Sequence, residues 1–264
     1  MDMSAGQPLQ VERTDDGVAL LTLSLPDRRN AMTTALTGAW RRTMAELRID
    51  RDLRCVVVTG AGSAFCAGGD LAWLGDSRNA PIDFFRSKMT AFYRDWLAIR
   101  DLEVPTIAAI NGAAVGAGLA VALACDLRYA TPEARMSVPF TALGLHPGMA
   151  TTWLLPEVTT MAAARDLLLT GRSVRGPEAV SLGLVSALAD DVAGHALSVA
   201  RTIAACAPLA TRLTKAALAR GGHRSIEDAL EWEALAQPIT MATADLHEGL
   251  AAQTERRRPV FTGD

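Results

Sequence analysis

Two segments of this chain share one plan, in which a buried strand runs into a turn of small residues and then into a helix. The first strand is Cys55-Val-Val-Val-Thr-Gly, followed by a turn over residues 61–70; the second strand covers residues 105–112 and leads to Gly116-Ala-Gly. The first turn of a helix has four amide groups without intrahelical partners, at the positive end of the helix dipole. Two such turns can therefore direct backbone amides at one oxygen atom, provided that only small residues stand there.

These turns admit three interpretations. Amides that converge on a thioester carbonyl would polarise it as it takes on enolate or oxyanion character, an effect of about 3–4 kcal/mol per donor in acyl-transfer enzymes. The glycines could instead serve only tight turns and close helix packing. A phosphate cradle is the third option, but the chain has neither GxGxxG with a downstream acid nor GxxxxGK[ST]. A nucleotide-binding fold is therefore disfavoured, while glycine spacing leaves the other two open.

The rest of the chain extends the same plan into an α/β fold. Alternating strands and helices with right-handed crossovers predict an α/β core, and the run of helices beyond residue 177 predicts an α-helical C-terminal part. The other expected elements are a hairpin over residues 10–23, helices over 33–49 and up to about 100, a short helix near Leu71, and strands at 126–130 and 136–138. A polar, lid-like stretch is expected over residues 75–82.

Composition excludes several classes of protein. The 264 residues suffice for one core with an appendage, and half of them are apolar. A net charge of -3 argues against a nucleic-acid surface. The N-terminal segment has no signal-peptide pattern, and the most apolar stretch, residues 107–124, is interrupted by Asn111 and by glycines. Four scattered cysteines without a CxxC pair predict reduced thiols. We expect a cytoplasmic protein with no membrane span, no nucleic-acid partner and no metal or redox cofactor.

Seven segments carry a resemblance to a known family. They are Pro26-Asp-Arg-Arg-Asn-Ala-Met, Phe65-Cys-Ala-Gly-Gly-Asp-Leu, Pro105-Thr-Ile-Ala-Ala-Ile-Asn-Gly-Ala-Ala-Val-Gly-Ala-Gly, Ala124-Cys-Asp-Leu-Arg-Tyr-Ala, Leu143-Gly-Leu-His-Pro-Gly, Leu169-Thr-Gly-Arg, and a tail from Glu248-Gly to Arg258-Pro-Val-Phe. In order and spacing the chain resembles the crotonase superfamily, the enoyl-CoA hydratase/isomerase family, nearly from end to end.

The resemblance implies a fold, an assembly and a ligand. The fold is a crotonase-like spiral of repeated ββα units with an α-helical C-terminal part. Residues 1–195 would form the acyl-CoA-binding core, and residues 196–264 a C-terminal helical trimerisation region, since family members commonly form trimers or dimers of trimers. The ligand would be a coenzyme A thioester, bound as substrate or as a ligand that is not turned over, with no further cofactor.

By the same resemblance, the oxyanion-hole donors are the amides of Gly69 and Ala117. Alanine at 117 replaces the usual glycine, which is tolerable because only its N–H is needed. The adenine and pantetheine of coenzyme A would pass residues of the first two segments. The substrate-binding set is Arg28, Ala31, Ala67, Gly68, Asp70, Leu71, Val115, Gly116, Gly118, Ala120, Pro139, Phe140 and Leu143.

The usual catalytic carboxylates of the family are missing. Hydration of an enoyl thioester needs a base for water and an acid for the α-carbon, and hydratases of this family use two glutamates. The aligned positions hold Ala120 and Phe140, and a third position, where some relatives carry an aspartate, holds Gly148. Hydratase activity is therefore in doubt. What remains is an apolar floor made of Leu119, Ala120, Val138 and Phe140, which suits an acyl chain.

Few titratable groups remain near the predicted acyl end. His146 is the best candidate for a catalytic role, although a histidine in a turn before proline can equally be structural. Cys66 is the only cysteine in a glycine-rich loop, but no histidine is close to it in sequence. Asp70 suits a helix N-cap and Asp126 a fixed hydrogen-bond acceptor. Residues 256–258, three arginines, match the basic tail of the family near coenzyme A phosphates, or form a solvated end.

Two hypotheses follow from these observations. In the first, the chain is an enzyme of fatty-acid or acyl-CoA metabolism, with a base supplied by His146, a lid residue or the substrate. In the second, it is a non-catalytic acyl-CoA-binding protein that delivers lipid thioesters to a partner.

Overall fold

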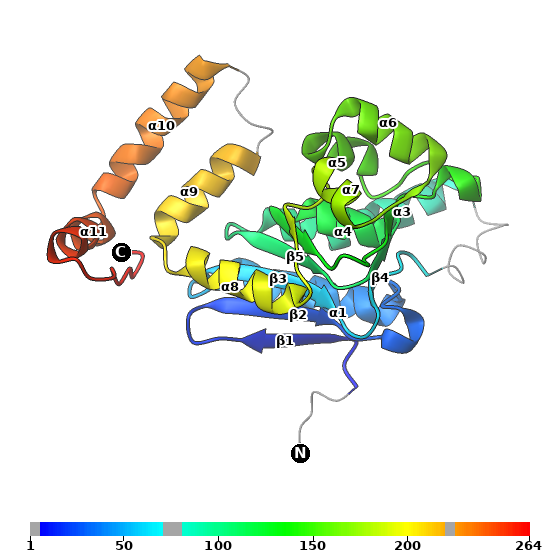
Figure 1. The fold of residues 1–264 in the computed structure, drawn as a ribbon, viewed down its shortest axis with the longest axis horizontal. Helices are drawn as coiled ribbons and strands as arrows, with labels where there is room; N and C mark the ends of the chain where they lie inside the picture. Colours follow the sequence, from blue (N-terminus) through cyan, green and yellow to red (C-terminus); the bar gives the residue numbers. More distant parts are fainter. Residues whose placement is uncertain (1–5, 71–80, 220–224) are drawn as a thin grey trace.

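A six-stranded sheet forms the centre of the molecule (Figure 1). The computed structural model describes residues 6–70, 81–219 and 225–264. In the order of the sheet, the strands are β1 (Leu9–Arg13), β2 (Val18–Leu23), β3 (Cys55–Gly60), β5 (Thr106–Ile110), β7 (Leu127–Ala130) and β10 (Ala187–Leu188). The pair β1 and β2 is the predicted antiparallel hairpin, and the other pairs are parallel. Parallel neighbours require crossovers, which the helices provide.

A second, four-stranded sheet was not expected from the sequence. Its strands, in order, are β4 (Ala64–Cys66), β6 (Ala113–Val115), β8 (Met136–Ser137) and β9 (Ser173–Val174). The first three follow directly on β3, β5 and β7, so the chain repeats a strand of each sheet before a helix. This repetition is the predicted ββα plan. Strands β4 and β6 lie inside segments that we predicted to be turns, because three residues are too few to show the alternation by which a strand is recognised.

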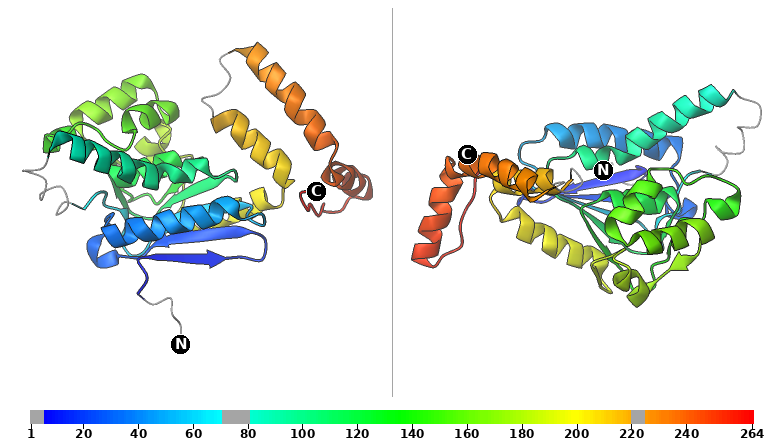
Figure 2. Two further views of the ribbon diagram at one scale, coloured as in Figure 1. Left: turned by 180° about the vertical axis from the view of Figure 1, so that it is seen from behind. Right: turned by 90° about the horizontal axis from the view of Figure 1, so that it is seen from above.

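Alternation along β3 divides the core between the two faces of the large sheet. Val56 and Val58 enter the larger cluster, with the helices α1 (Thr34–Ile49), α3 (Ile82–Leu97) and α4 (Ala117–Ala124). Cys55 and Val57 face α8 (Val192–Ala204) in the smaller one. Figure 2 shows α1 and α3 on one side of the sheet and α8 on the other. A strand covered on both faces has to be apolar throughout, as β3 is.

The predicted helix over residues 33–49 is confirmed as α1, and its sequence explains where it begins and which face it buries. The hydroxyl of Thr33 accepts a hydrogen bond from the amide of Leu36, which caps the helix. Buried residues then recur at helical spacing, and the Trp40 ring stacks on Trp96 of α3 with the ring centroids 4.9 Å apart. α1 therefore packs firmly against α3.

Short helices complete the core, and three longer ones extend beyond it. The core helices are the 3-10 turns η1 (Pro26–Arg28), η2 (Ala98–Asp101) and η3 (Thr141–Leu143), with α5 (Thr151–Val158), α6 (Met161–Thr170) and α7 (Gly176–Ser181). The others are α9 (Pro208–Ala219), α10 (Ile226–Met241) and α11 (Ala244–Glu255), which lie to one side of the sheet in Figure 1. The predicted short helix near Leu71 and most of the predicted lid lie outside the described residues.

The predicted domain division at residue 195 lies inside α8, whose buried face packs on β3 and β5. The helices α9 to α11 are thus the part that leaves the core, and the division itself stays a prediction. Over the described residues, no single helix is long and apolar enough to cross a membrane; α8 and α9 meet that test only together, with a bend of 112° between them.

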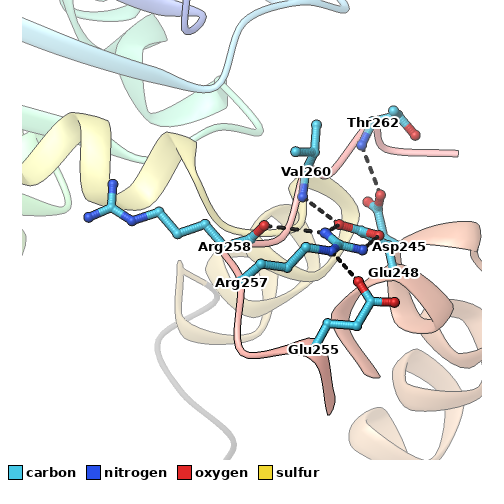
Figure 3. Close-up of polar contacts among 7 residues, drawn as sticks. All are labelled: Asp245, Glu248, Glu255, Arg257, Arg258, Val260 and Thr262. Atoms are coloured by element: carbon cyan, nitrogen blue, oxygen red, sulfur yellow. Dashed lines mark hydrogen bonds and ion pairs between the residues drawn. The ribbon is translucent and has the colours of Figure 1, made fainter. Parts of the chain in front are cut away.

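A cluster of carboxylates folds the C-terminal tail back on α11 (Figure 3). Both carboxylate oxygens of Glu248 bind the guanidinium of Arg257, one of them at 2.8 Å, and Glu248 also accepts the amide of Val260. The Arg257 guanidinium holds the pKa of the Glu248 carboxyl at about 2. Asp245 accepts two further amides of the tail. One of the three arginines of this segment is therefore engaged within its own chain.

An ion pair between a buried lysine and a partly exposed aspartate joins the C-terminal helices to the core. Asp126, predicted as a fixed hydrogen-bond acceptor, receives the amide and the hydroxyl of Thr106 at 2.7 and 2.8 Å, which confirms that interpretation. The same carboxylate pairs with the Lys215 ammonium of α9 at 2.8 Å, and Lys215 also donates to the carbonyl of Val104. The lysine side chain is only 8% exposed. Its charge therefore depends on these two partners.

Replacing Lys215 by methionine should lower the free energy of unfolding by about 1–3 kcal/mol, because Asp126 and the Val104 carbonyl each lose a partner. Chemical denaturation measures the change. The other lysine of the chain, Lys88 of α3, provides the control: its ammonium lies 6.0 Å from the centre of the Phe84 ring, and Lys88→Met should change stability by less than about 1 kcal/mol. Equal losses in the two variants would contradict a structural role for the pair.

Candidate functional site

The two predicted turns lie against each other because β4 pairs with β6. The pairing is parallel and brings Ala64 beside Ala113 and Cys66 beside Ala114. Gly68 follows β4 with φ +94°, and a Cβ built on it would lie 2.6 Å from the carbonyl oxygen of Val115 and 3.5 Å from the amide nitrogen of Ala117. Only glycine permits both this backbone conformation and this contact.

Both predicted donor amides lie at this contact. Ala117 is the first residue of α4, where a helix leaves its amide groups free. Gly69 follows Gly68, and a Cβ built on Gly69 would meet nothing within 4 Å. Within the described part of the chain, neither amide donates to another residue. The arrangement therefore has two adjacent, unused N–H groups with open space next to one of them.

Asn30 fixes the loop that faces these turns, and our sequence reasoning did not single it out. Its side chain is fully buried, donates to the carbonyls of Ala64 and Ala61, and accepts the amide of Leu25 at 2.8 Å. Its φ of +56° lies in the left-handed region, which asparagine tolerates better than most residues. The signal was present in the sequence, since an asparagine after the Pro26 turn can bond several carbonyls, but the partners are distant in sequence.

The residues predicted to contact coenzyme A come together at this loop. The amide of Met32 donates to the Gly68 carbonyl at 2.9 Å, which places Ala31 beside the first turn. The guanidinium of Arg28 pairs with the Asp70 carboxylate at 3.0 Å, while its side chain stays 53% exposed. Ala67 is held by a bond from its amide to the carbonyl of Arg29. Leu71 lies outside the described residues.

The floor beside Ala117 is apolar. Ala120 is fully buried and points into the core with Leu119 and Val138. Phe140 is half-buried, and its ring lies 3.5 Å from where a Cβ on Gly116 would be. No side chain of this floor can therefore transfer a proton.

α4 presses closely on β4 at the same place. A Cβ on Gly118 would collide with the Cys66 carbonyl, so any larger residue there would push the helix away from the strand. Cys66 itself is buried, and burial raises the pKa of its thiol to about 12. A protonated thiol is a poor nucleophile, and its sulfur contacts the carbonyl of Asn30 instead.

The segment from Pro139 to Gly148 holds the remaining predicted residues. Pro139 packs near Gly171, and Leu143 is 63% exposed in η3. His146 is exposed, with its Nδ1 2.8 Å from the carbonyl oxygen of Pro147, and its catalytic role stays a prediction. At the third carboxylate position, Gly148 is buried.

Comparisons with known proteins agree with this arrangement. The family model described as "Enoyl-CoA hydratase/isomerase" matches residues 13–264. A Mycobacterium tuberculosis protein named "Probable enoyl-CoA hydratase echA14" is 42% identical over 217 residues, covering 81% of this chain and 83% of that protein. The human "Enoyl-CoA hydratase domain-containing protein 2, mitochondrial" is 36% identical over 270 residues, covering 98% and 91%. The crystal structure of an enoyl-CoA hydratase from Bacillus anthracis superposes with a TM-score of 0.92 at 31% identity, covering 98% and 100%.

Replacing Asn30 by alanine should lower the free energy of unfolding by about 2–4 kcal/mol, because buried carbonyls and an amide lose their partner. Asn111 provides the matched control, since it also bonds a carbonyl and an amide but is only half-buried. Asn111→Ala should cost about 0.5–1.5 kcal/mol. Denaturant titrations of both variants give the comparison, and a smaller loss at residue 30 than at residue 111 would refute the role given to Asn30.

Proposed function

Since the chain belongs to the enoyl-CoA hydratase/isomerase family, we propose that it binds acyl-CoA thioesters with the carbonyl oxygen between the amides of Gly69 and Ala117. The observation that carries this proposal is the contact of two turns whose amides have no partner among the described residues. The resemblance inferred from the sequence is confirmed at the level of the family. The amides would stabilise negative charge on the oxygen of an enolate or tetrahedral species.

The coenzyme would enter along the loop that Asn30 holds. The guanidinium of Arg28 is half exposed, although it is paired with Asp70, and it can offer N–H groups to a phosphate. At the C-terminal end, Arg257 is engaged with Glu248, so Arg256 and Arg258 are the arginines of the tail that we assign to coenzyme A phosphates. In Figure 3 the side chain of Arg258 extends away from the carboxylate cluster.

Two activities remain compatible with this binding mode. An enzyme of acyl-CoA metabolism would use the two amides with a base other than the missing glutamates, and His146 is our candidate. A non-catalytic acyl-CoA-binding protein would hold the thioester for a partner. The apolar side chains of Ala120 and Phe140 favour the second activity over simple hydration, because neither can move a proton.

We also propose that residues 196–264 form the contact of a trimer or a dimer of trimers. None of the residues of α10 is buried, and its exposed side chains include the apolar Ile226, Leu230, Leu235 and Ile239. A group of large exposed apolar side chains on one helix generally marks a contact surface. A cytoplasmic location likewise remains our proposal, while the human relative carries "mitochondrial" in its name.

Removing one donor amide should weaken binding. Ala117→Pro deletes the N–H at the first position of α4, where proline suits the helical backbone, whereas Ala117→Gly keeps it. Calorimetry with butyryl-CoA should give about tenfold weaker binding for the proline variant and a change below about twofold for glycine. Thermal melting would verify that both variants fold. Unaltered binding by a folded proline variant would exclude this amide as a donor.

Hydration of crotonyl-CoA tests the absence of the carboxylates. The unaltered protein should show almost no hydration, and the double variant Ala120→Glu, Phe140→Glu should hydrate faster, because it restores a base and an acid. His146→Ala is compared across a panel of enoyl-, 3-hydroxyacyl- and 3-ketoacyl-CoA thioesters. Fast hydration by the unaltered protein would show that residues 120 and 140 are not the relevant positions.

A further inference from the structure

The hydroxyl of Tyr93 occupies the space that a side chain at position 148 would fill. Tyr93 lies on α3, and a Cβ built on Gly148 would be 2.5 Å from its phenol oxygen and 3.1 Å from its Cζ. The glycine therefore admits the phenol, and any larger residue would displace it. A hydroxyl on α3 therefore lies where a side chain at position 148 would otherwise stand.

The Tyr93 hydroxyl is connected to Phe140 of the apolar floor through the loop that contains Gly148. Gly148 belongs to the loop that starts at Phe140, and this loop is held by a bond from the amide of Leu145 to the Phe140 carbonyl at 2.9 Å. The ring of Phe140 lies beside Gly116, which precedes Ala117. Both α3 and α5 pack against α4, the helix that begins with Ala117. Through Gly148, Tyr93 is thus in contact with the loop that follows Phe140 of the apolar floor.

The backbone next to Gly148 is strained and firmly held. Met149 and Ala150 have φ values of +55° and +54°, in the left-handed region that residues other than glycine and asparagine rarely adopt. Thr151 is buried, and its hydroxyl donates to the Gly148 carbonyl at 2.9 Å. Strained backbone persists where the surroundings fix it, and it is concentrated at functional sites. The position of the loop relative to the phenol is therefore well defined.

The chemistry of the phenol suits a hydrogen-bond donor. Burial raises the pKa of Tyr93 above its ordinary value, and the backbone of Met149 only partly opposes this effect. The group is therefore neutral at physiological pH and carries its hydrogen. The phenol oxygen accepts the amide of Met149, and a hydroxyl that accepts one hydrogen bond can still donate its own hydrogen to a ligand.

We propose that Tyr93 donates a hydrogen bond to an oxygen atom on the acyl chain, and thereby selects acyl-CoA thioesters that carry a hydroxyl or keto group beyond the thioester carbonyl. The inference rests on the proposed binding of acyl-CoA. Since Ala120 and Phe140 contribute no polar atom, this hydroxyl decides between an oxygenated chain and a plain one of equal length. A polar substrate group that meets a buried partner is favoured over an analogue that leaves the partner unpaired.

The ratio of two dissociation constants tests the proposal. Calorimetry compares 3-hydroxybutyryl-CoA with butyryl-CoA, and the unaltered protein should bind the first about 3- to 10-fold more tightly. Tyr93→Phe removes only the hydroxyl and should bring the ratio close to one. The only other tyrosine, Tyr129 on β7, packs against His195, and Tyr129→Phe should keep the preference.

A second variant separates the position of the hydroxyl from its presence. Gly148→Ala keeps the tyrosine but places a methyl group against its oxygen, so the preference should fall as in Tyr93→Phe. If the unaltered protein binds neither thioester, the proposed function itself fails. If it binds both equally, or if Tyr93→Phe retains the preference, the role of Tyr93 is refuted while acyl-CoA binding stands.

Discussion

The parallel pairing of β4 with β6 is the interaction on which the site depends. It brings together two turns that are separated by about 50 residues in the chain, Gly68 with its neighbour on one side and Ala117 on the other. Glycine at positions 68 and 118 lets the backbones touch, because a methyl group at either would collide with a carbonyl oxygen. The proposed donors are main-chain amides, so the geometry of the pairing would define the site more than any side chain does.

A site built from backbone amides can keep its place while the surrounding side chains change. Around these turns the charged groups are at the rim, where Arg28 pairs with Asp70, and the interior is apolar. Cys66 is held as a neutral thiol by burial. The phenol of Tyr93, on α3, lies against Gly148 in the loop that follows Phe140. In the proposed binding mode, the thioester and the acyl chain are therefore recognised by different elements of the fold.

The C-terminal helices are attached to this core by few but specific contacts. Lys215 of α9 reaches the same carboxylate that fixes the start of β5, so a single aspartate serves both the sheet and the attached helices. At the far end, Glu248 and Arg257 fold the tail back on α11. α10 between them has no buried residue. The C-terminal segment is thus fixed by polar contacts at α9 and at the tail, whereas the residues of α10 between them stay at least partly exposed.

Local patterns in the sequence were enough to predict α1, the hairpin, β3 and the apolar helix α4, because each has its own periodicity or composition. The motifs also identified the family and the two turns. The second sheet, the anchoring role of Asn30 and the placement of Tyr93 beside Gly148 came only from the tertiary structure. In each of these cases the partners are far apart in the chain and the segments are short, so no local periodicity records the contact. Tertiary packing alone decided which of these short segments form strands and which hydroxyl lies beside Gly148.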